Sequence, residues 1–204
     1  MSDEGSGLQR TADRTADRRL LRGARSRRAI LRRAVDMASL DGLDGLSFGV
    51  LAADLGMSKS GVQTLFGTKE TLQIATVECA GGVFDEAVVR PAGTAPHGAA
   101  RLRALVEAWI GYASDPLFPG GCFWAANEAA FDSRPGPVHD VLFAGRRSWR
   151  TLLADELRHA GATDADLKAF QLDAVLIAAN TALRRGEGEA VEQVRRVTEH
   201  LLQD

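Results

Sequence analysis

Ser47–Phe66, which reads SFGVLAADLGMSKSGVQTLF, has the spacing of two short helices joined by a tight turn. Leu51 and Leu55 give the first helix one apolar face. Gly56 follows where the chain must turn, and glycine adopts a left-handed backbone more easily than any other residue. Ser58 is a good N-cap for the second helix. The stretch therefore predicts a helix-turn-helix, the motif whose second helix enters the major groove of DNA.

The second predicted helix has one apolar and one polar side. Val62 and Leu65 are three residues apart and form the buried side. The outward side carries hydrogen-bonding residues near the helix N-terminus, the end that reads base edges in this motif: Lys59, Ser60, Gln63 and Thr64. An ordinary helical hairpin is the alternative interpretation, but the combined spacing favours a DNA-binding motif.

The residues around the motif continue the pattern. They are Ile30, Ala34, GLSF at Gly45–Phe48 and FGTKETL at Phe66–Leu72. On these grounds the segment from residue 27 to residue 75 resembles the TetR/AcrR family of bacterial transcriptional repressors. The chain departs from the family at Gln63, where members usually carry a DNA-contacting tyrosine. The resemblance therefore implies the mode of DNA binding but not the operator sequence.

The candidate DNA-binding residues lie on the motif and at its borders. Gln63 can bond bidentately to adenine, and Lys59 can bind guanine or a phosphate. Phosphate contacts position a protein without reading sequence, and three residues are assigned to them: Arg28, Ser47 and Lys69. Thr68 can cap the next helix, whose N-terminal amides favour phosphate. The predicted set is Arg28, Ser47, Lys59, Ser60, Gln63, Thr64, Thr68 and Lys69.

Charge is unevenly distributed along the chain. The net charge is −2, but residues 1–72 hold twelve basic and nine acidic residues, whereas residues 73–204 hold thirteen and eighteen. Residues 1–26 are rich in serine, glycine and charge, and we predict a disordered basic tail there. Arg22 and Arg25 at its end, and Arg27 directly after it, are expected to reach a neighbouring phosphate or the minor groove. The alternative interpretation is a solvated tail that does not contact DNA, which the same composition would also suit.

Length and cysteine content bound the class of protein. The 204 residues suffice for one large or two small domains, and 45% of them are hydrophobic, as in globular proteins. The absence of a long apolar run and of a secretory signal predicts a cytoplasmic protein. The resemblance to the TetR/AcrR family implies that it is bacterial and is associated with the nucleoid when bound to DNA. Cys79 and Cys122 have no metal-ligand spacing with the histidines, so no metal or other cofactor is expected. No catalytic motif occurs, and we predict no enzyme.

Helical periodicity continues to the end of the chain. It predicts an all-α fold of about nine helices, with a three-helix DNA-binding head over residues 27–72 and a larger ligand-binding and dimerisation body over residues 73–204. The first helix is predicted from about Arg27 to Ser39. A helix that begins near Lys69 is expected to end before Pro91. Thr163, followed by Asp166, resembles a capping box.

Aromatic residues are concentrated in one part of the body. An apolar cavity with a few polar groups is the usual form of a small-molecule site, although the same residues could simply fill a core. TetR-like proteins bind an inducer in this region, so the resemblance implies a small apolar or aromatic effector. The candidate ligand-binding residues are Trp109, Cys122, Phe123, Trp124, Asn127, Phe131 and Trp149. For Cys122 itself, a buried core thiol is favoured over a redox sensor.

The last two predicted helices have faces that suit close packing. One carries Ala174, Ala178, Ala179 and Ala182, and the other is rich in valine. In the resembling family these helices pair across a two-fold axis, which implies a homodimer, with intrachain packing as the alternative. Two recognition helices can also read a near-palindrome. The sequence thus predicts a ligand-responsive homodimeric repressor, with a helical protein-interaction module or a transcriptional activator without small-molecule induction as alternatives.

Overall fold

A computed structural model describes the backbone of residues 4–203 and the side chains of residues 21–203. Within this part the chain is helical and contains no strand, so the all-α prediction is confirmed. The elements are α1 (Glu4–Asp41), the 3₁₀ turn η1 (Leu43–Gly45), α2 (Phe48–Asp54), α3 (Lys59–Phe66), α4 (Lys69–Phe84), the π-helical segment η2 (Asp85–Val89), α5 (Arg90–Ala92), α6 (Ala99–Ser114), α7 (Phe123–Phe131), α8 (Pro137–His159), α9 (Ala165–Arg184) and α10 (Ala190–Leu202). Since α4, η2 and α5 are continuous, the described residues form nine helices besides η1.

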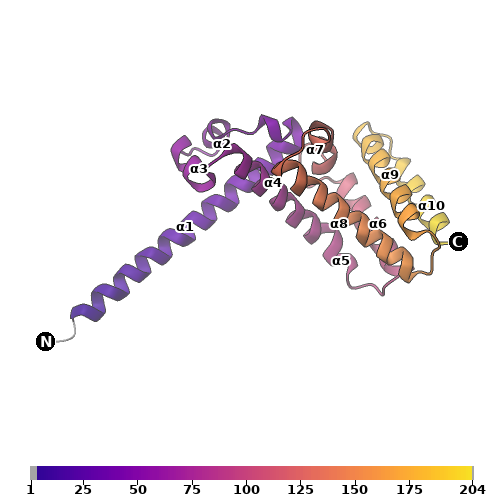
Figure 1. Cartoon of the computed structure of the whole chain (residues 1–204), viewed down its shortest axis with the longest axis horizontal. Coiled ribbons are helices and arrows are strands. Elements are labelled where there is room, and N and C mark those ends of the chain that lie inside the picture. The colour runs from indigo at the N-terminus through magenta and orange to yellow at the C-terminus, as the bar shows by residue number, and fades with distance from the viewer. Residues whose placement is uncertain (1–3, 204) are drawn as a thin grey trace.

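Helix α1 is much longer than predicted. We expected it to begin near Arg27 after a disordered tail, but it begins at Glu4, so the prediction of disorder is wrong for residues 4–26. The tail's residues 1–3 lie outside the described residues. The sequence has no proline before Pro91, and alanine and arginine favour helix, so nothing stops the helix from extending backward from its packed part. Figure 1 shows the N-terminal part of α1 extending away from the other helices.

The head is built on a small apolar core with three capped helices. The buried residues of this core come from α1, α2, α3 and the start of α4: Ile30, Ala34, Ala38, Leu51, Ala52, Val62, Phe66 and Leu72. The side chains of Ser47, Ser58 and Thr68 cap α2, α3 and α4, and each accepts a hydrogen bond from a backbone N–H three residues on, at 3.1 Å. Gly56 has φ 62°, the left-handed conformation predicted for the turn. The helix-turn-helix is therefore present as predicted.

The helix that begins at Lys69 continues past its predicted end. It passes through η2 and α5 and contains Pro91 near its last residue. Proline lacks an amide hydrogen, and its ring crowds a carbonyl group of the preceding turn in a regular α-helix. A π-helical turn before the proline changes which backbone groups of successive turns lie opposite each other. The irregular segment begins at Asp85, three residues after the glycine pair Gly81 and Gly82.

The body is a layered helical bundle on the C-terminal side of the head (Figure 1). Helix α4 packs on α8, α8 packs on α9, and α9 packs on α10, while α6 contacts α8 and α10. The predicted capping box at Thr163 is wrong, because the N-cap of α9 is Asp164, in the left-handed region at φ 49° without a side-chain cap bond. Among the described residues, none of the helices has the length and apolar character needed to cross a membrane.

Candidate DNA-binding surface and ligand pocket

The polar side of α3 faces solvent. Val62 and Phe66 are buried against the head, whereas all four predicted base-reading residues are exposed: Lys59, Ser60, Gln63 and Thr64. The hydroxyl of Thr64 donates to the carbonyl oxygen of Ser60 at 2.8 Å and so turns back onto its own helix. Gln63 and Lys59 present longer polar side chains on the same surface. These two residues are therefore best suited to reach base edges.

Helix α3 is held in place by an arginine of α1. The guanidinium of Arg27 donates to the carbonyl oxygen of Leu65 at 3.2 Å and lies 4.6 Å from the centroid of the Phe66 ring. Arg27 therefore positions the recognition helix, which differs from its predicted contact with a neighbouring phosphate. Arg33 makes a second link, because it forms a bidentate pair with Asp54 of α2 at 2.6 and 2.9 Å. Its hydrogen bonds lower the pKa of Asp54.

The predicted phosphate-contacting residues surround the recognition helix at element borders. Arg28 is exposed on α1, and Lys69 is exposed at the start of α4, where its Nζ donates to the carbonyl oxygen of Asp44 at 2.6 Å. Ser47 and Thr68 are engaged as caps, so they order the helix N-termini whose amides favour phosphate. Thr71, which the sequence analysis missed, is exposed on the first turn of α4 with its Oγ1 2.9 Å from that of Thr68.

Asn127 joins the head to the body and does not line the pocket, contrary to prediction. It is buried on α7, and its Oδ1 accepts a hydrogen bond from the backbone N–H of Leu43 at 2.7 Å. Its Nδ2 donates to the carbonyl oxygens of Ala38 at 3.1 Å and Phe123 at 2.8 Å. The bonds to Ala38 at the end of α1 and to Leu43 of η1 fix the body against the head, whereas the bond to Phe123 lies within α7.

Further contacts complete this joint. The backbone N–H of Gly120 donates to Ser39 Oγ at 2.9 Å, and a Cβ at Gly120 would lie only 1.7 Å from the Ser39 carbonyl oxygen. Only glycine permits this approach. Arg134, after α7, pairs with Asp44 of η1 at 2.7 Å. Gln73 of α4 donates to the carbonyl oxygen of Leu43 at 2.9 Å. The head and the body are therefore connected by α4 and by polar contacts that are buried at Asn127 and Gln73 and exposed at Arg134.

An apolar cavity of about 280 Å³ lies in the body next to α4 and α8. Four of the predicted ligand-binding residues line it: Trp109, Cys122, Trp124 and Trp149. The other lining residues were not predicted: Gly81, Phe84, Asp85, Val89, Gly145, Arg146, Ser148 and Leu152. The cavity is thus walled mostly by aromatic and aliphatic side chains, which is the usual form of a small-molecule site.

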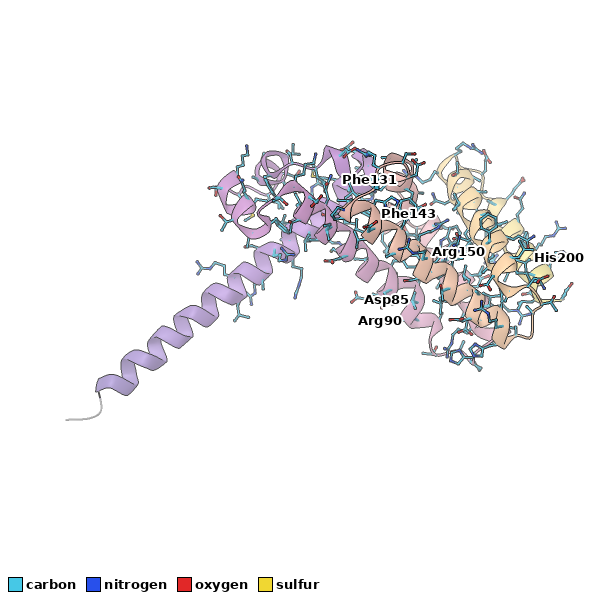
Figure 2. The ribbon with its side chains drawn as sticks, in the orientation of Figure 1. Asp85, Arg90, Phe131, Phe143, Arg150 and His200 are labelled. Atoms are coloured by element: carbon cyan, nitrogen blue, oxygen red, sulfur yellow. The ribbon has the colours of Figure 1, made fainter. Side chains whose placement is uncertain are left out.

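Phe84 is the centre of the aromatic wall. Its ring makes edge contacts with Tyr112, Trp124 and Trp149 at centroid distances of 5.3, 5.4 and 5.2 Å. It is the last residue of α4 and precedes Asp85 of η2, which is labelled in Figure 2. The sequence analysis missed Phe84 because it lies far from the other aromatic residues along the chain. Its position connects the pocket directly to the helix that enters the head.

Two predicted ligand-binding aromatics have other roles. Phe123 is fully buried and contacts the rings of Phe118 and Trp124 at centroid distances of 6.4 and 5.7 Å. Phe131, labelled in Figure 2, is also buried, and the guanidinium of Arg134 lies 4.2 Å above its ring. Neither residue lines the cavity. Both prove to be core residues, the alternative considered for this aromatic group.

The polar groups of the cavity are sparse. The indole Nε1 of Trp124 is buried without a hydrogen-bond partner, close to the backbone of Gly145. Arg146 pairs with Asp173 of α9 at 3.0 Å and lies 3.8 Å from Glu128 of α7. Burial raises the pKa of both carboxyl groups above their ordinary values.

The thiol of Cys122 is in a similar setting. Burial raises its pKa, and the neighbouring Tyr112 hydroxyl also has a raised pKa for the same reason. The thiol is therefore held in its protonated form, which is the less reactive form. Cys122 is half-buried at the edge of the cavity, so it is not a fully buried core residue, but its raised pKa argues against a redox-sensing thiol.

An apolar stripe on α9 is exposed. Leu167, Phe170 and Ile177 are 56%, 55% and 40% exposed, and Ala174 and Ala178 lie exposed on the same helix. These five residues form the α9 stripe. By contrast, the inner face of α10 packs within the chain, because Val194, Thr198 and Leu201 are buried. The valine-rich face therefore serves intrachain packing, and the surface available to a second subunit lies mainly on α9.

Comparison with known proteins places this architecture in a family. Residues 98–198 match the family model of the tetracyclin repressor-like C-terminal domain. A TetR transcriptional regulator from Chloroflexus aurantiacus superposes with a TM-score of 0.81 at 20% identity, over 90% of this chain and 97% of the other. A TetR-family transcriptional regulator from Streptomyces coelicolor gives a TM-score of 0.77 at 20% identity, over 89% and 95%.

A regulator of the TetR family from Cytophaga hutchinsonii is similar to the same extent, with a TM-score of 0.76 at 18% identity, over 90% and 98%. No curated protein shows significant sequence similarity to the chain. The structural likeness establishes the fold of a helix-turn-helix head on a helical body, and the matched C-terminal domain agrees with it. The chain therefore belongs to the TetR family of transcriptional regulators.

Proposed function

We propose that the chain is a ligand-responsive homodimeric repressor that binds a near-palindromic DNA operator. The observation that carries this proposal is the continuous run from α4 to α5. It is capped by Thr68 beside the recognition helix, and it lines the cavity with Phe84, Asp85 and Val89. One continuous helical run thus belongs to both the DNA-binding surface and the pocket.

The exposed side of α3 supports sequence-specific DNA binding. Gln63 is the proposed base reader, with Lys59, Ser60 and Thr64 beside it. Arg28 and Lys69, with the helix ends ordered by Ser47 and Thr68, are the proposed phosphate contacts. We place the border between the DNA-binding domain, residues 27–72, and the ligand-binding and dimerisation domain, residues 73–204, in the first turns of α4.

The α9 stripe supports a homodimer. An exposed row of large apolar side chains on a packed helix is costly in water unless a partner covers it, and a two-fold interface uses the same patch on both subunits. The small residues Ala174 and Ala178 between the large ones allow a second α9 to approach closely. α10 contributes the edge of this interface. Two heads in one dimer can then read two half-sites.

The cavity supports regulation by a small, largely apolar molecule with an aromatic ring. The walls of the cavity offer the edges and faces of aromatic rings. Its two charged residues already have partners, because Arg146 pairs with Asp173 at 3.0 Å and Asp85 pairs with Arg90 at 3.0 Å. A ligand that favours one position of α4 would change the spacing of the two heads. The ligand can shift the DNA affinity only by the difference between its own affinities for the two positions of α4. Binding to operator DNA also implies a cytoplasmic location.

The proposal is tested by combining DNA footprinting with tryptophan fluorescence. The cavity is lined by Trp109, Trp124 and Trp149, so an aromatic ligand that enters it should quench their fluorescence. The purified chain should protect two half-sites on one duplex, and a quenching ligand should release that protection. Protection that persists at saturating ligand would contradict induction, and higher transcription on binding would favour an activator. Absence of protection on any duplex would favour a protein-interaction module.

A further inference from the structure

Three metal-ligating side chains meet at the end of the body. Each of His97, Glu156 and His159 offers one ligand atom, and these atoms all lie within 4.8 Å of one another. The cluster lies where the loop after α5 meets the end of α8, and Figure 1 shows this region on the side of the body away from α2 and α3. We propose that these residues bind a divalent transition-metal ion. The proposed DNA and effector sites use none of them.

The backbone brings the three side chains together. Glu156 and His159 are three residues apart on the last turn of α8, so they share one face of the helix. His97 comes from the loop between α5 and α6. The next residue, Gly98, has φ +91°, and a Cβ there would lie 3.1 Å from the carbonyl oxygen of His159. The loop can therefore approach α8 this closely only with glycine at this position.

Glu156 is oriented as a ligating carboxylate would be. Its side chain is only 2% exposed, and its Oε2 accepts a hydrogen bond from the backbone N–H of Gly98 at 2.8 Å. Its Oε1 lies 2.9 Å from His97 Nδ1. One oxygen is thus held by the backbone while the other contacts the imidazole of His97. Such outer hydrogen bonds fix ligand geometry in known metal sites.

The two imidazoles are also close to each other. The ring centroids of His97 and His159 lie 4.8 Å apart. An ion bound by His97 Nδ1 and Glu156 Oε1 would replace their direct contact, and the ligand nitrogen of His159 lies within 4.8 Å of both atoms. The helix end and the loop would then be bound to one ion.

A cationic neighbour limits the affinity of this site. Arg101 Nη1 lies 3.1 Å from His97 Nδ1, the proposed ligand atom, 2.9 Å from His97 Nε2 and 3.9 Å from Glu156 Oε1. The rest of its guanidinium donates to the carbonyl oxygens of Ala95 and Gly93 at 2.9 and 3.0 Å. Arg101 thereby partly neutralises the buried carboxylate and fastens the loop. A bound ion would repel this guanidinium, so the site should bind more weakly than a closed structural zinc site.

The donor set defines the class of ion. Two imidazole nitrogens and one carboxylate suit Zn²⁺, Co²⁺, Ni²⁺ or Cu²⁺, whereas Mg²⁺ and Ca²⁺ prefer oxygen ligands. Three protein ligands leave a further position for water. A short-range sequence motif does not reveal the site, because His97 and Glu156 are 59 residues apart.

The test uses the untagged full chain. We expect calorimetry to show one Zn²⁺ ion per chain and no Mg²⁺, and Co²⁺ to give the visible absorption of a low-coordinate site. His97→Ala and His159→Ala should each weaken Zn²⁺ binding by at least about tenfold. Glu156→Gln, which can still accept from Gly98, should weaken it as well. The chain's other two histidines provide matched controls, so His139→Ala and His200→Ala should leave Zn²⁺ binding unchanged.

The ligand histidines are exposed, so their alanine variants should fold like the wild type, which thermal unfolding without metal would verify. No Zn²⁺ binding by the wild type would overturn the proposal, and so would binding that His97→Ala and His159→Ala leave intact. Because the assay contains neither DNA nor effector, its result is independent of whether the chain proves to be a repressor.

Discussion

Asn127 of α7 accepts a hydrogen bond from the backbone N–H of Leu43 at 2.7 Å, and this bond crosses the joint between the body and the head. The same amide donates to Ala38 at the end of α1. The cavity and the recognition helix are thus connected by two routes, a buried polar network and the continuous run from α4 to α5. A structural change at the pocket can move the head only if the polar network and the run from α4 to α5 can both accommodate that movement.

Asn127→Leu should therefore destabilise the chain. The substitution keeps the size of the side chain but leaves the Leu43 N–H and the Ala38 carbonyl oxygen with fewer partners, at about 1–3 kcal/mol per unsatisfied buried group. Urea unfolding measures the loss. Asn180→Leu is the matched control, because the side-chain oxygen of Asn180 is buried without a hydrogen-bond partner. Equal losses in the two variants would show that the Asn127 network contributes no specific stability.

Gln63→Ala should relax the preference for one base pair in each half-site. The expected cost is about 1–3 kcal/mol on the preferred sequence and little on sequences altered at that position, because a base-reading contact discriminates between bases. Quantitative binding to a set of single-base operator variants measures this effect. Uniform weakening across the whole set would show that Gln63 does not read a base.

Lys69→Ala should weaken binding equally on all sequences. A lost phosphate contact lowers the slope of log affinity against log salt by about one unit. Arg150→Ala is a suitable control, since Arg150 is an exposed residue of α8, away from the recognition helix (Figure 2). An unchanged salt slope in Lys69→Ala would mean that the ammonium group serves only its bond to Asp44.

Phe170→Glu should convert the dimer into a monomer. Phe170 is the largest exposed side chain of the α9 stripe, and a carboxylate would be buried without a partner in the interface. Light scattering after gel filtration measures the mass, and operator affinity should fall with it. Gln171→Glu adds the same charge at the adjacent exposed position of α9. If both variants remain dimeric, the stripe is not the interface.

Glu128→Gln should reduce the dependence of stability on pH. Burial raises the pKa of Glu128, so the folded chain holds this proton to higher pH than the unfolded chain does. The resulting stabilisation is present below the ordinary glutamate pKa and is lost as pH rises through the raised folded value. Melting temperatures recorded between the ordinary glutamate pKa and the raised pKa of the folded chain measure this loss of stabilisation. Glu86→Gln, at an exposed position, is the control. A wild-type pH profile in Glu128→Gln would contradict this assignment.

Local features of the fold were predictable from the sequence because they depend on neighbouring residues. The caps at Ser58 and Thr68 and the turn at Gly56 are of this kind. The start of α1 was not predictable, since low hydrophobicity indicated disorder while helix propensity permitted a continuous helix. The joint and much of the pocket depend on tertiary contacts. Asn127 was wrongly assigned to the pocket and Phe84 was not predicted at all, because no short-range pattern shows which helix faces meet.

Selection of bound DNA from a random duplex pool, repeated at two salt concentrations, tests the central claim most directly. Two recognition helices held in one dimer should enrich a near-palindrome whose half-sites have a fixed spacing, and the yield should fall steeply as salt rises. Enrichment of no sequence, with the same yield at both salt concentrations, would contradict the assignment of α3 as a DNA reader.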